Sequence, residues 1–210
     1  LAVRDGVADR IAGHVLQRVL LADVRALLAD DDAQLDFPVD VVGRHLQLAS
    51  ELLERGVASR EDIDSAMKGG CNFPMGPLAL LDLVGLDTSL SILDALYEEF
   101  KDPNYAAAPT LRRLVSGQKL GRKSGAGFYD WKDGKAVKPP ASSASVPPDL
   151  IDRMILALVN ECVATWREKV VDDADFIDAA VIFGTGFAPF RGGPLAYARS
   201  RGSADVVARL

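Results

Sequence analysis

A pattern of residues that occurs twice constrains the fold of this chain more than any other feature of its sequence. Residues 60–79 read REDIDSAMKGGCNFPMGPLA, and residues 174–196 read ADFIDAAVIFGTGFAPFRGGPLA. An amphipathic segment precedes each copy, and the second copy has three more loop residues. A helical unit that cannot bury its apolar face alone packs against its neighbour. The sequence therefore predicts two related helical units. Matched residues stand 114 positions apart: Ile63-Asp64 and Ile177-Asp178, Ala66 and Ala180, Gly70 and Gly184, Phe73 and Phe187.

Apolar residues recur at helical spacing along most of the chain, which predicts an all-α fold. The pattern favours helices over residues 9–30 and 39–55, and from Ile151 to Cys162. Ser59, followed three residues later by Asp62, is typical of a helix N-terminus. Gly76-Pro77 predicts the start of another helix. Strand signals are limited to a short extended piece at residues 127–129. The apolar face of the helix after Gly76 runs through Leu78, Leu81, Val84, Leu90, Leu93 and Leu96.

One segment differs in composition from the rest of the chain. Residues 132–148, KDGKAVKPPASSASVPP, are rich in lysine, serine and proline and offer little to bury. Such a composition indicates an exposed linker. We therefore expect a first helical unit at residues 1–131, the linker, and a second, shorter copy at residues 149–210.

Composition and charge exclude several classes of protein. The formal net charge of −6 and pI near 5.0 argue against a nucleic-acid partner, which usually meets a basic surface. The longest stretch without a charge, residues 69–81, is too short and too interrupted to span a membrane. Cys71 and Cys162 lie far apart, which indicates neither a metal site nor a disulfide framework. No secretory signal is visible, and we expect a reducing, cytoplasmic setting.

The loop Phe73-Pro74-Met75-Gly76-Pro77 has two interpretations. Its two prolines restrict the backbone on either side of a glycine, so the loop is stiff. It precedes a helix N-terminus, so its apolar side chains could line an acyl pocket where negative charge is favoured. The alternative is a turn that leads into a helix and whose Phe and Met fill the core. From these residues alone, the second interpretation is favoured.

Residues 119–129, KLGRKSGAGFY, combine glycines with three cations. Backbone N–H groups and cations in such a loop can hold phosphate, and an ordinary solvated turn is the equal alternative. The pattern is neither a dinucleotide fingerprint nor a P-loop. His14 and His45 have no acid at a spacing that would make a catalytic pair. No nucleophile–base arrangement and no paired acids are recognisable.

Taken together, these motifs resemble a known family. GVASREDIDSAMKGGCNFPMGPLALLDLVGLDT followed by KLGRKSGAGFYDW is similar to the C-terminal domain of the NAD-dependent 3-hydroxyacyl-CoA dehydrogenases. Residues 153–202 resemble the further copy of that domain that ends the alpha subunit of the bacterial fatty acid oxidation complex. The resemblance covers about residues 46–210, while residues 1–45 match poorly.

The resemblance implies the NAD-dependent oxidation of 3-hydroxyacyl-CoA to 3-oxoacyl-CoA in fatty acid beta-oxidation. This region would bind the acyl-CoA substrate and form a homodimer. In the family, a Rossmann domain that binds NAD and a His–Glu catalytic pair precede this region. No βαβ pattern or glycine fingerprint precedes residue 60, so we expect that machinery to lie outside this chain, in cis or in trans. We therefore expect the chain alone to be inactive, and we assign no catalytic residue and no metal ligand.

The resemblance also assigns roles to individual residues. Lys123 corresponds to the cation that reaches NAD. Phe183 stands where the family usually has a substrate-contacting Tyr, so only the ring contact remains. Phe73, Pro74 and Met75 would lie near the acyl end of the cleft. The family's Asn-Arg pair on the first helix of the domain has no counterpart in residues 11–14 or 41–44. The alternative function is therefore a non-catalytic helical assembly module that kept the family fold.

Overall fold

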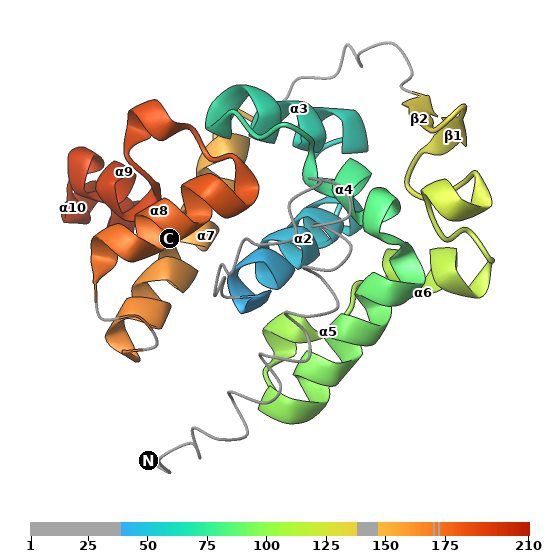
Figure 1. Ribbon diagram of the computed structural model, residues 1–210, viewed down its shortest axis with the longest axis horizontal. Coiled ribbons are helices and arrows are strands. Elements are labelled where there is room, and N and C mark those ends of the chain that lie inside the picture. The colour runs from blue at the N-terminus through green and yellow to red at the C-terminus, as the bar shows by residue number, and fades with distance from the viewer. Residues whose placement is uncertain (1–38, 138–146, 170, 172) are drawn as a thin grey trace.

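A computed structural model describes residues 39–137, 147–169, 171 and 173–210 of the chain (Figure 1). The mostly helical fold predicted from the sequence is confirmed. The predicted helix over residues 9–30 and His14 lie outside the described residues, as do residues 138–146 of the expected linker. The α-helices of the described residues are α2 Val39–Glu54, α3 Arg60–Cys71, α4 Pro77–Val84, α5 Leu86–Phe100, α6 Pro109–Ser116, α7 Leu150–Arg167, α8 Ala174–Thr185, α9 Pro194–Arg201 and α10 Ser203–Arg209. Short 3-10 helices are η1 Pro103–Tyr105, η2 Arg122–Ser124 and η3 Pro189–Arg191.

Helix α2 lies at the centre of the molecule, between two groups of helices (Figure 1). It packs against α4 on one side and α7 on the other, and α7 in turn contacts α3 and α9. One continuous apolar core therefore joins the two parts of the chain. Most of the predicted inward face of α7 lies in it, whereas Ile151 is 38% exposed. Fully buried core residues include Ile63, Met67, Leu78, Leu111, Met154, Ile155, Cys162, Val181 and Phe187.

The predicted helix starts are confirmed. The Ser59 hydroxyl accepts the N–H of Asp62 at the start of α3 and donates to the Asp62 carboxylate at 2.6 Å. The two residues stand at the positions of a capping box, but the Asp62 carboxylate accepts from the Ser59 hydroxyl in place of the Ser59 backbone N–H. Pro77 is the first residue of α4 and follows Gly76 as predicted. Its missing N–H costs nothing there, since that group has no partner inside a helix.

One predicted helix is wrong in its extent. The face running from Leu78 to Leu96 was expected to belong to a single helix, but it is divided between α4 and α5 at Gly85. Gly85 has φ of +108°, a conformation that residues with a side chain rarely adopt. The N–H of Leu86 then donates to the carbonyl of Leu120 instead of continuing the helix. The break lets the chain turn between α4 and α5 without losing backbone hydrogen bonds.

The segment after α6 corrects the expected start of the linker. Strands β1 Asp130–Lys132 and β2 Lys135–Val137 form an antiparallel hairpin, with Trp131 opposite Ala136. The extended structure is thus three residues further along than expected, and part of the segment assigned to the linker is paired. Asp133 and Gly134 both have positive φ. An Asp-Gly turn of this kind matches the twist of two strands, and it is the local signal that predicts the hairpin.

Among the described residues, no helix combines the length and the apolar character needed to cross a membrane.

Candidate functional site

The loops of the two sequence copies meet inside the molecule. The rings of Phe73 and Phe187 pack edge to face, with their centroids 6.2 Å apart. The N–H of Ala188 donates to the carbonyl of Cys71 at 2.8 Å. Gly186 lies so close to Pro74 that an added Cβ would come within 2.8 Å of its ring. The contact is therefore both apolar and hydrogen-bonded, and it fixes the position of each loop.

A buried aspartate holds the helix that follows each loop. Asp64 in α3 accepts the N–H groups of Leu78 and Ala79 at the start of α4. Asp178 in α8 accepts the N–H groups of Leu195 and Ala196 at the start of α9. Both carboxylates thus occupy a helix N-terminus, where negative charge is stabilised. Burial raises the pKa of Asp178, while the two N–H groups oppose that rise. The donors are the same Leu-Ala pair in both copies, Leu78-Ala79 and Leu195-Ala196.

The glycine-rich segment folds around a third buried carboxylate, that of Asp82. The N–H groups of Phe128 and Tyr129 and the indole N–H of Trp131 all donate to it. Burial raises the pKa of Asp82, and these donors oppose the rise. Since an Asp in an otherwise apolar helix needs such partners, these contacts fix the segment against α4.

The backbone hydrogen bonds of residues 119–129 bear on the two interpretations of this segment. The N–H groups of Leu120, Gly121, Ser124, Gly125 and Gly127 all donate to acceptors within the segment. A concavity of free N–H groups that could hold a phosphate is therefore not formed by them. These contacts favour the turn interpretation for those five residues, whereas the N–H groups of Arg122 and Lys123 begin η2 and have no acceptor of this kind.

Lys123 lies on η2, and its side chain is 49% exposed. Its amino group pairs with the Asp87 carboxylate at 2.5 Å. The hydrogen bond from Lys123 is the main reason that the pKa of Asp87 is lowered. An exposed pair of this kind contributes little to stability. The Lys123 amino group therefore lies at the surface beside Gly85, paired with one exposed carboxylate.

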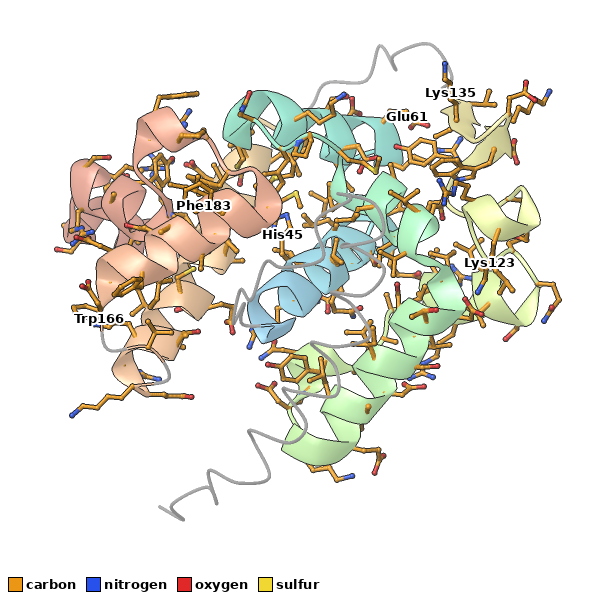
Figure 2. All side chains as sticks on the ribbon, in the orientation of Figure 1. His45, Glu61, Lys123, Lys135, Trp166 and Phe183 are labelled. Carbon is orange, nitrogen blue, oxygen red and sulfur yellow. The ribbon has the colours of Figure 1, made fainter. Side chains whose placement is uncertain are left out.

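The other predicted site residues lie elsewhere. Phe73 is buried, Pro74 is exposed, and Met75 is partly buried against the core. Phe183, near the end of α8, is 73% exposed. Figure 2 shows Phe183 and Lys123 at opposite sides of the molecule. The structure thus brings residues 73–75 next to the loop that follows Phe183, and it keeps Lys123 apart from both.

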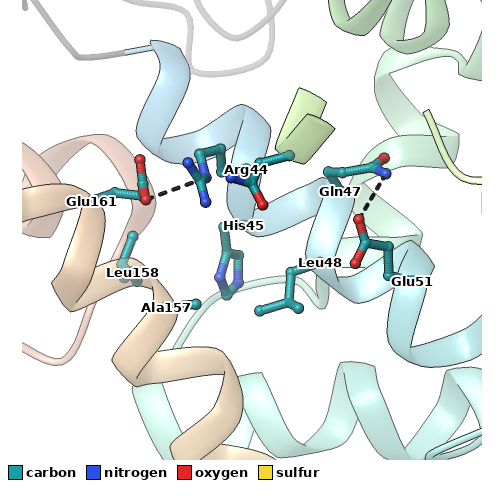
Figure 3. Close-up of a pocket in the computed structure, with 9 residues that line it drawn as sticks. Arg44, His45, Gln47, Leu48, Glu51, Ala157, Leu158 and Glu161 are labelled. Atoms are coloured by element: carbon teal, nitrogen blue, oxygen red, sulfur yellow. Dashed lines mark hydrogen bonds and ion pairs between the residues drawn. The ribbon is translucent and has the colours of Figure 1, made fainter. Parts of the chain in front are cut away.

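A small cavity of about 70 Å³ lies between α2 and α7 (Figure 3). Arg44 pairs with Glu161 at 3.2 Å across it. The imidazole of His45 lies between Leu48 and Ala157 in this view and contacts Phe73 edge to face at 5.6 Å. The lining residues are Arg44, His45, Gln47, Leu48, Glu51, Asn104, Ala157, Leu158 and Glu161.

His45 is buried, which agrees with a helix-packing role. Neither ring nitrogen has a hydrogen-bond partner among the described residues. Burial lowers the pKa of His45 to about 4, so the ring is neutral at physiological pH. No acid orients it, and the structure provides no acid–base pair here. Sequence reasoning left its burial open, because a His on an amphipathic helix fits either face.

Three buried carboxylates and Arg191 were not singled out as site residues. The sequence repeat identifies Asp64 and Asp178 only as matched residues, and no sequence pattern singles out Asp82. A lone acid between buried apolar neighbours, as in LALLDLVG, was the available signal, because a buried charge needs partners. For Arg191 the sequence offered no comparable signal.

The two cysteines are buried and free. Burial raises the pKa of the Cys71 thiol to about 12, and the charge of Arg191 opposes that rise. The thiol is therefore protonated and unreactive at neutral pH. Across residues 39–137 and the described part of 147–210, no cluster of three His, Cys, Asp or Glu side chains could hold a metal ion.

Comparisons with known proteins bear on the same residues. Residues 40–131 match the family described as 3-hydroxyacyl-CoA dehydrogenase, C-terminal domain. The fatty acid oxidation complex subunit alpha of Acinetobacter baumannii (strain AYE) is 36% identical over 180 residues, which cover 76% of this chain and 25% of that protein. The 3-hydroxybutyryl-CoA dehydrogenase of Clostridioides difficile is 58% identical over 76 residues, 36% of this chain and 27% of that protein.

A solved structure extends the likeness in fold. The 3-hydroxybutyryl-CoA dehydrogenase from Escherichia coli K12 superposes with a TM-score of 0.64 at 22% identity, covering 82% of this chain and 54% of that one. The chain spans about a quarter of the length of the curated relatives named above. The family match, with the 36% identity to the alpha subunit, shows that residues 40–131 of this chain belong to the 3-hydroxyacyl-CoA dehydrogenase C-terminal domain family.

Proposed function

We propose that this chain is the helical, substrate-binding and dimerisation region of an NAD-dependent 3-hydroxyacyl-CoA dehydrogenase. The family match over residues 40–131 is the observation that carries the proposal. In this role the helices close the cleft over acyl-CoA and NAD and exclude water. A Rossmann domain, in cis or in trans, supplies the catalytic His–Glu pair. When bound, NAD would supply the hydride acceptor for the carbon that bears the 3-hydroxyl, and the His of the Rossmann domain would take the hydroxyl proton, so that the product is 3-oxoacyl-CoA.

Lys123 is our proposed contact to NAD. Its amino group is at the surface and is held by one exposed carboxylate, that of Asp87. A diphosphate carries more charge than that carboxylate and can replace it as the partner. In this proposal the amino group of Lys123 supplies the positive charge that orients the cofactor.

Residues 73–75 and Phe183 are our proposed contacts to the acyl-CoA. The exposure of Phe183 and Pro74 supports direct contact, since both present apolar surface to solvent. Phe73 is buried against Phe187 and His45. We therefore assign Phe73 a positioning part, in which it fixes the loop that presents Pro74 and Met75.

The same proposal covers organisation and location. We propose two related helical units, at residues 1–131 and 149–210. The matching hydrogen bonds of Asp64 and Asp178 support this division. Exposed apolar side chains such as Trp166 and Phe176 support a homodimer. The free, buried cysteines support a reducing, cytoplasmic setting.

The test uses a separately prepared Rossmann domain of the family. The chain is mixed with it, and NADH formation from 3-hydroxybutyryl-CoA is followed. We expect activity in the mixture and a loss of at least about tenfold with Lys123→Ala, because a charged hydrogen bond to phosphate is lost. Lys119→Ala is the matched control, since Lys119 is also exposed and lies on the same segment. Equal activity of both variants would contradict the role of Lys123.

The second candidate is a non-catalytic assembly module. The absence of an Asn-Arg pair from residues 41–44 and the Phe at position 183 favour it. The same experiment tests this module. It would be supported if the chain and the Rossmann domain associate stably but a saturating concentration of the chain gives no gain in activity.

A further inference from the structure

The loop between α8 and α9 contains an arginine without a charged partner. Among the described arginines that form no ion pair, Arg122 and Arg167 are exposed, whereas Arg191 is partly buried. The Nε atom of Arg191 is fully buried and has no hydrogen-bond partner. An unsatisfied buried donor on a charged group is costly. Because this atom is closed to solvent, a ligand can meet only the terminal nitrogens of the guanidinium, which form no hydrogen bond or ion pair within the described part of the chain.

Aromatic rings surround this guanidinium. Its carbon lies 5.2 Å from the centroid of the Tyr197 ring and 5.9 Å from that of Phe190. Cation–π contact of this kind holds the guanidinium in place, but it leaves the N–H donors unused. Phe190 is 81% exposed, so one face of its ring is open. An oriented cation beside an open aromatic face is suited to a planar, negatively charged ligand.

The position of Arg191 connects this feature to the proposed acyl-CoA contacts. The N–H of Arg191 donates to the carbonyl of Ala188, and Ala188 in turn donates to Cys71, next to the 73–75 loop. Phe183 lies at the end of the helix that leads into this loop. Lys123 lies at the other side of the molecule, as Figure 2 shows. A ligand on Arg191 is therefore near the residues proposed for acyl-CoA and far from the residue proposed for NAD.

We infer that Arg191 and Phe190 form a binding site for the phosphate and adenine ring of an adenosine nucleotide. The guanidinium donates to a phosphate oxygen, and the Phe190 ring stacks on the base. This inference rests on the proposed function for its source of ligand, because both coenzyme A and NAD carry an adenosine phosphate. The distance from Lys123 assigns the site to coenzyme A.

Calorimetric titration of the 210-residue chain tests this site without any dehydrogenase activity. Coenzyme A and NAD are titrated separately into the unmodified chain and into Arg191→Gln, Arg191→Lys and Phe190→Leu. We expect coenzyme A to bind, and Arg191→Gln to weaken its binding about tenfold. Arg191→Lys keeps the charge and shows a smaller loss. Phe190→Leu removes an exposed ring and also weakens binding. Arg167→Gln is the matched control, an exposed arginine without an ion pair, and leaves binding unchanged.

The outcomes distinguish coenzyme A from NAD as the ligand, and they distinguish failure of this site from failure of the proposed function. An effect of Arg191→Gln on coenzyme A alone assigns the site to the acyl-CoA, and an effect on NAD alone assigns it to the cofactor. Binding of neither molecule, or equal affinity of the unmodified chain and both Arg191 variants, overturns the site. Thermal unfolding of each variant shows whether Arg191 is needed only for packing on Tyr197. If the Rossmann mixture is inactive while Arg191 still governs binding, the dehydrogenase role fails and this site stands.

Discussion

The rings of Phe73 and Phe187, which occupy matching places in the two sequence copies, meet edge to face with their centroids 6.2 Å apart. The imidazole of His45 also packs edge to face with the ring of Phe73, with the two centroids 5.6 Å apart. Both phenylalanines are at most 8% exposed. The two copies are thus joined through the same residue of each, and this contact fixes the loops that we assign to substrate.

The Phe73–Phe187 contact predicts a measurable coupling. Phe73→Leu and Phe187→Leu are each expected to lower the free energy of unfolding by about 0.5–3 kcal/mol. The double variant should lose less than the sum, by about 0.5–1.5 kcal/mol, because the ring contact is removed only once. Urea denaturation measures all three. Phe190→Leu paired with Phe73→Leu is the control and should be additive, since Phe190 is exposed. Additivity of the Phe73 and Phe187 changes would contradict the contact.

The two capping aspartates predict graded losses of stability. Asp64→Asn and Asp178→Asn each leave one helix N–H without its acceptor, and we expect each to cost about 1–3 kcal/mol. The loss should be larger for Asp64, because the Tyr129 hydroxyl donates to its carboxylate at 3.0 Å, whereas the third partner of Asp178 is the exposed Arg199 at 3.4 Å, and such an exposed pair contributes little. Asp130→Asn is the control at an exposed position. Thermal or urea unfolding that ranks Asp178→Asn above Asp64→Asn would show that the Tyr129 bond adds nothing.

His45 predicts an acid-sensitive fold. Its pKa is about 4 in the folded chain and about 6.5 when unfolded. The unfolded state therefore binds the proton first as the pH falls, and stability falls between pH about 6.5 and about 4 by up to about 3 kcal/mol. His45→Leu should remove this part of the pH dependence. Carboxylates such as Asp82 contribute equally to both curves of unfolding free energy against pH. Their contribution therefore cancels in the difference between the curves. Parallel curves would contradict a buried, neutral His45.

Local signals predicted much of the fold. The start of α3 at Ser59, the start of α4 at Gly76-Pro77 and the inward face of α7 all depend on neighbours within one or two turns. The break at Gly85 was missed because a glycine inside an apolar pattern does not show which backbone conformation the packing imposes. The hairpin was missed because the composition of residues 132–148 outweighed the Asp-Gly turn inside it.

The candidate site was less accessible to sequence reasoning, because its partners come from distant segments. The motif identified Lys123, but only the fold places Asp87 beside it. His45 has no acid three or four residues away on its helix, but only packing against α7 and Phe73 shows that both nitrogens are buried without partners. The surroundings of Arg191 likewise depend on how η3 and α9 meet. Contacts between residues far apart along the chain set these environments.

The exposed ion pair between Lys123 and Asp87 predicts that the charge of Lys123 can be removed with little loss of stability. Lys123→Ala removes an exposed ion pair with Asp87 and should change the free energy of unfolding by less than about 1 kcal/mol. Urea denaturation of this variant beside Lys119→Ala tests this. A large loss would mean that Lys123 supports the fold, and its effect on activity could then not be assigned to the cofactor.

The most direct test of the whole account is the turnover of 3-hydroxybutyryl-CoA with NAD by the 210-residue chain, alone and with a separate Rossmann domain of the family. Our account predicts no NADH formation by the chain alone and restored turnover in the mixture, above that of the Rossmann domain by itself. Turnover at ordinary enzyme rates by the chain alone would contradict it, because the hydride-transfer machinery would then lie within these residues.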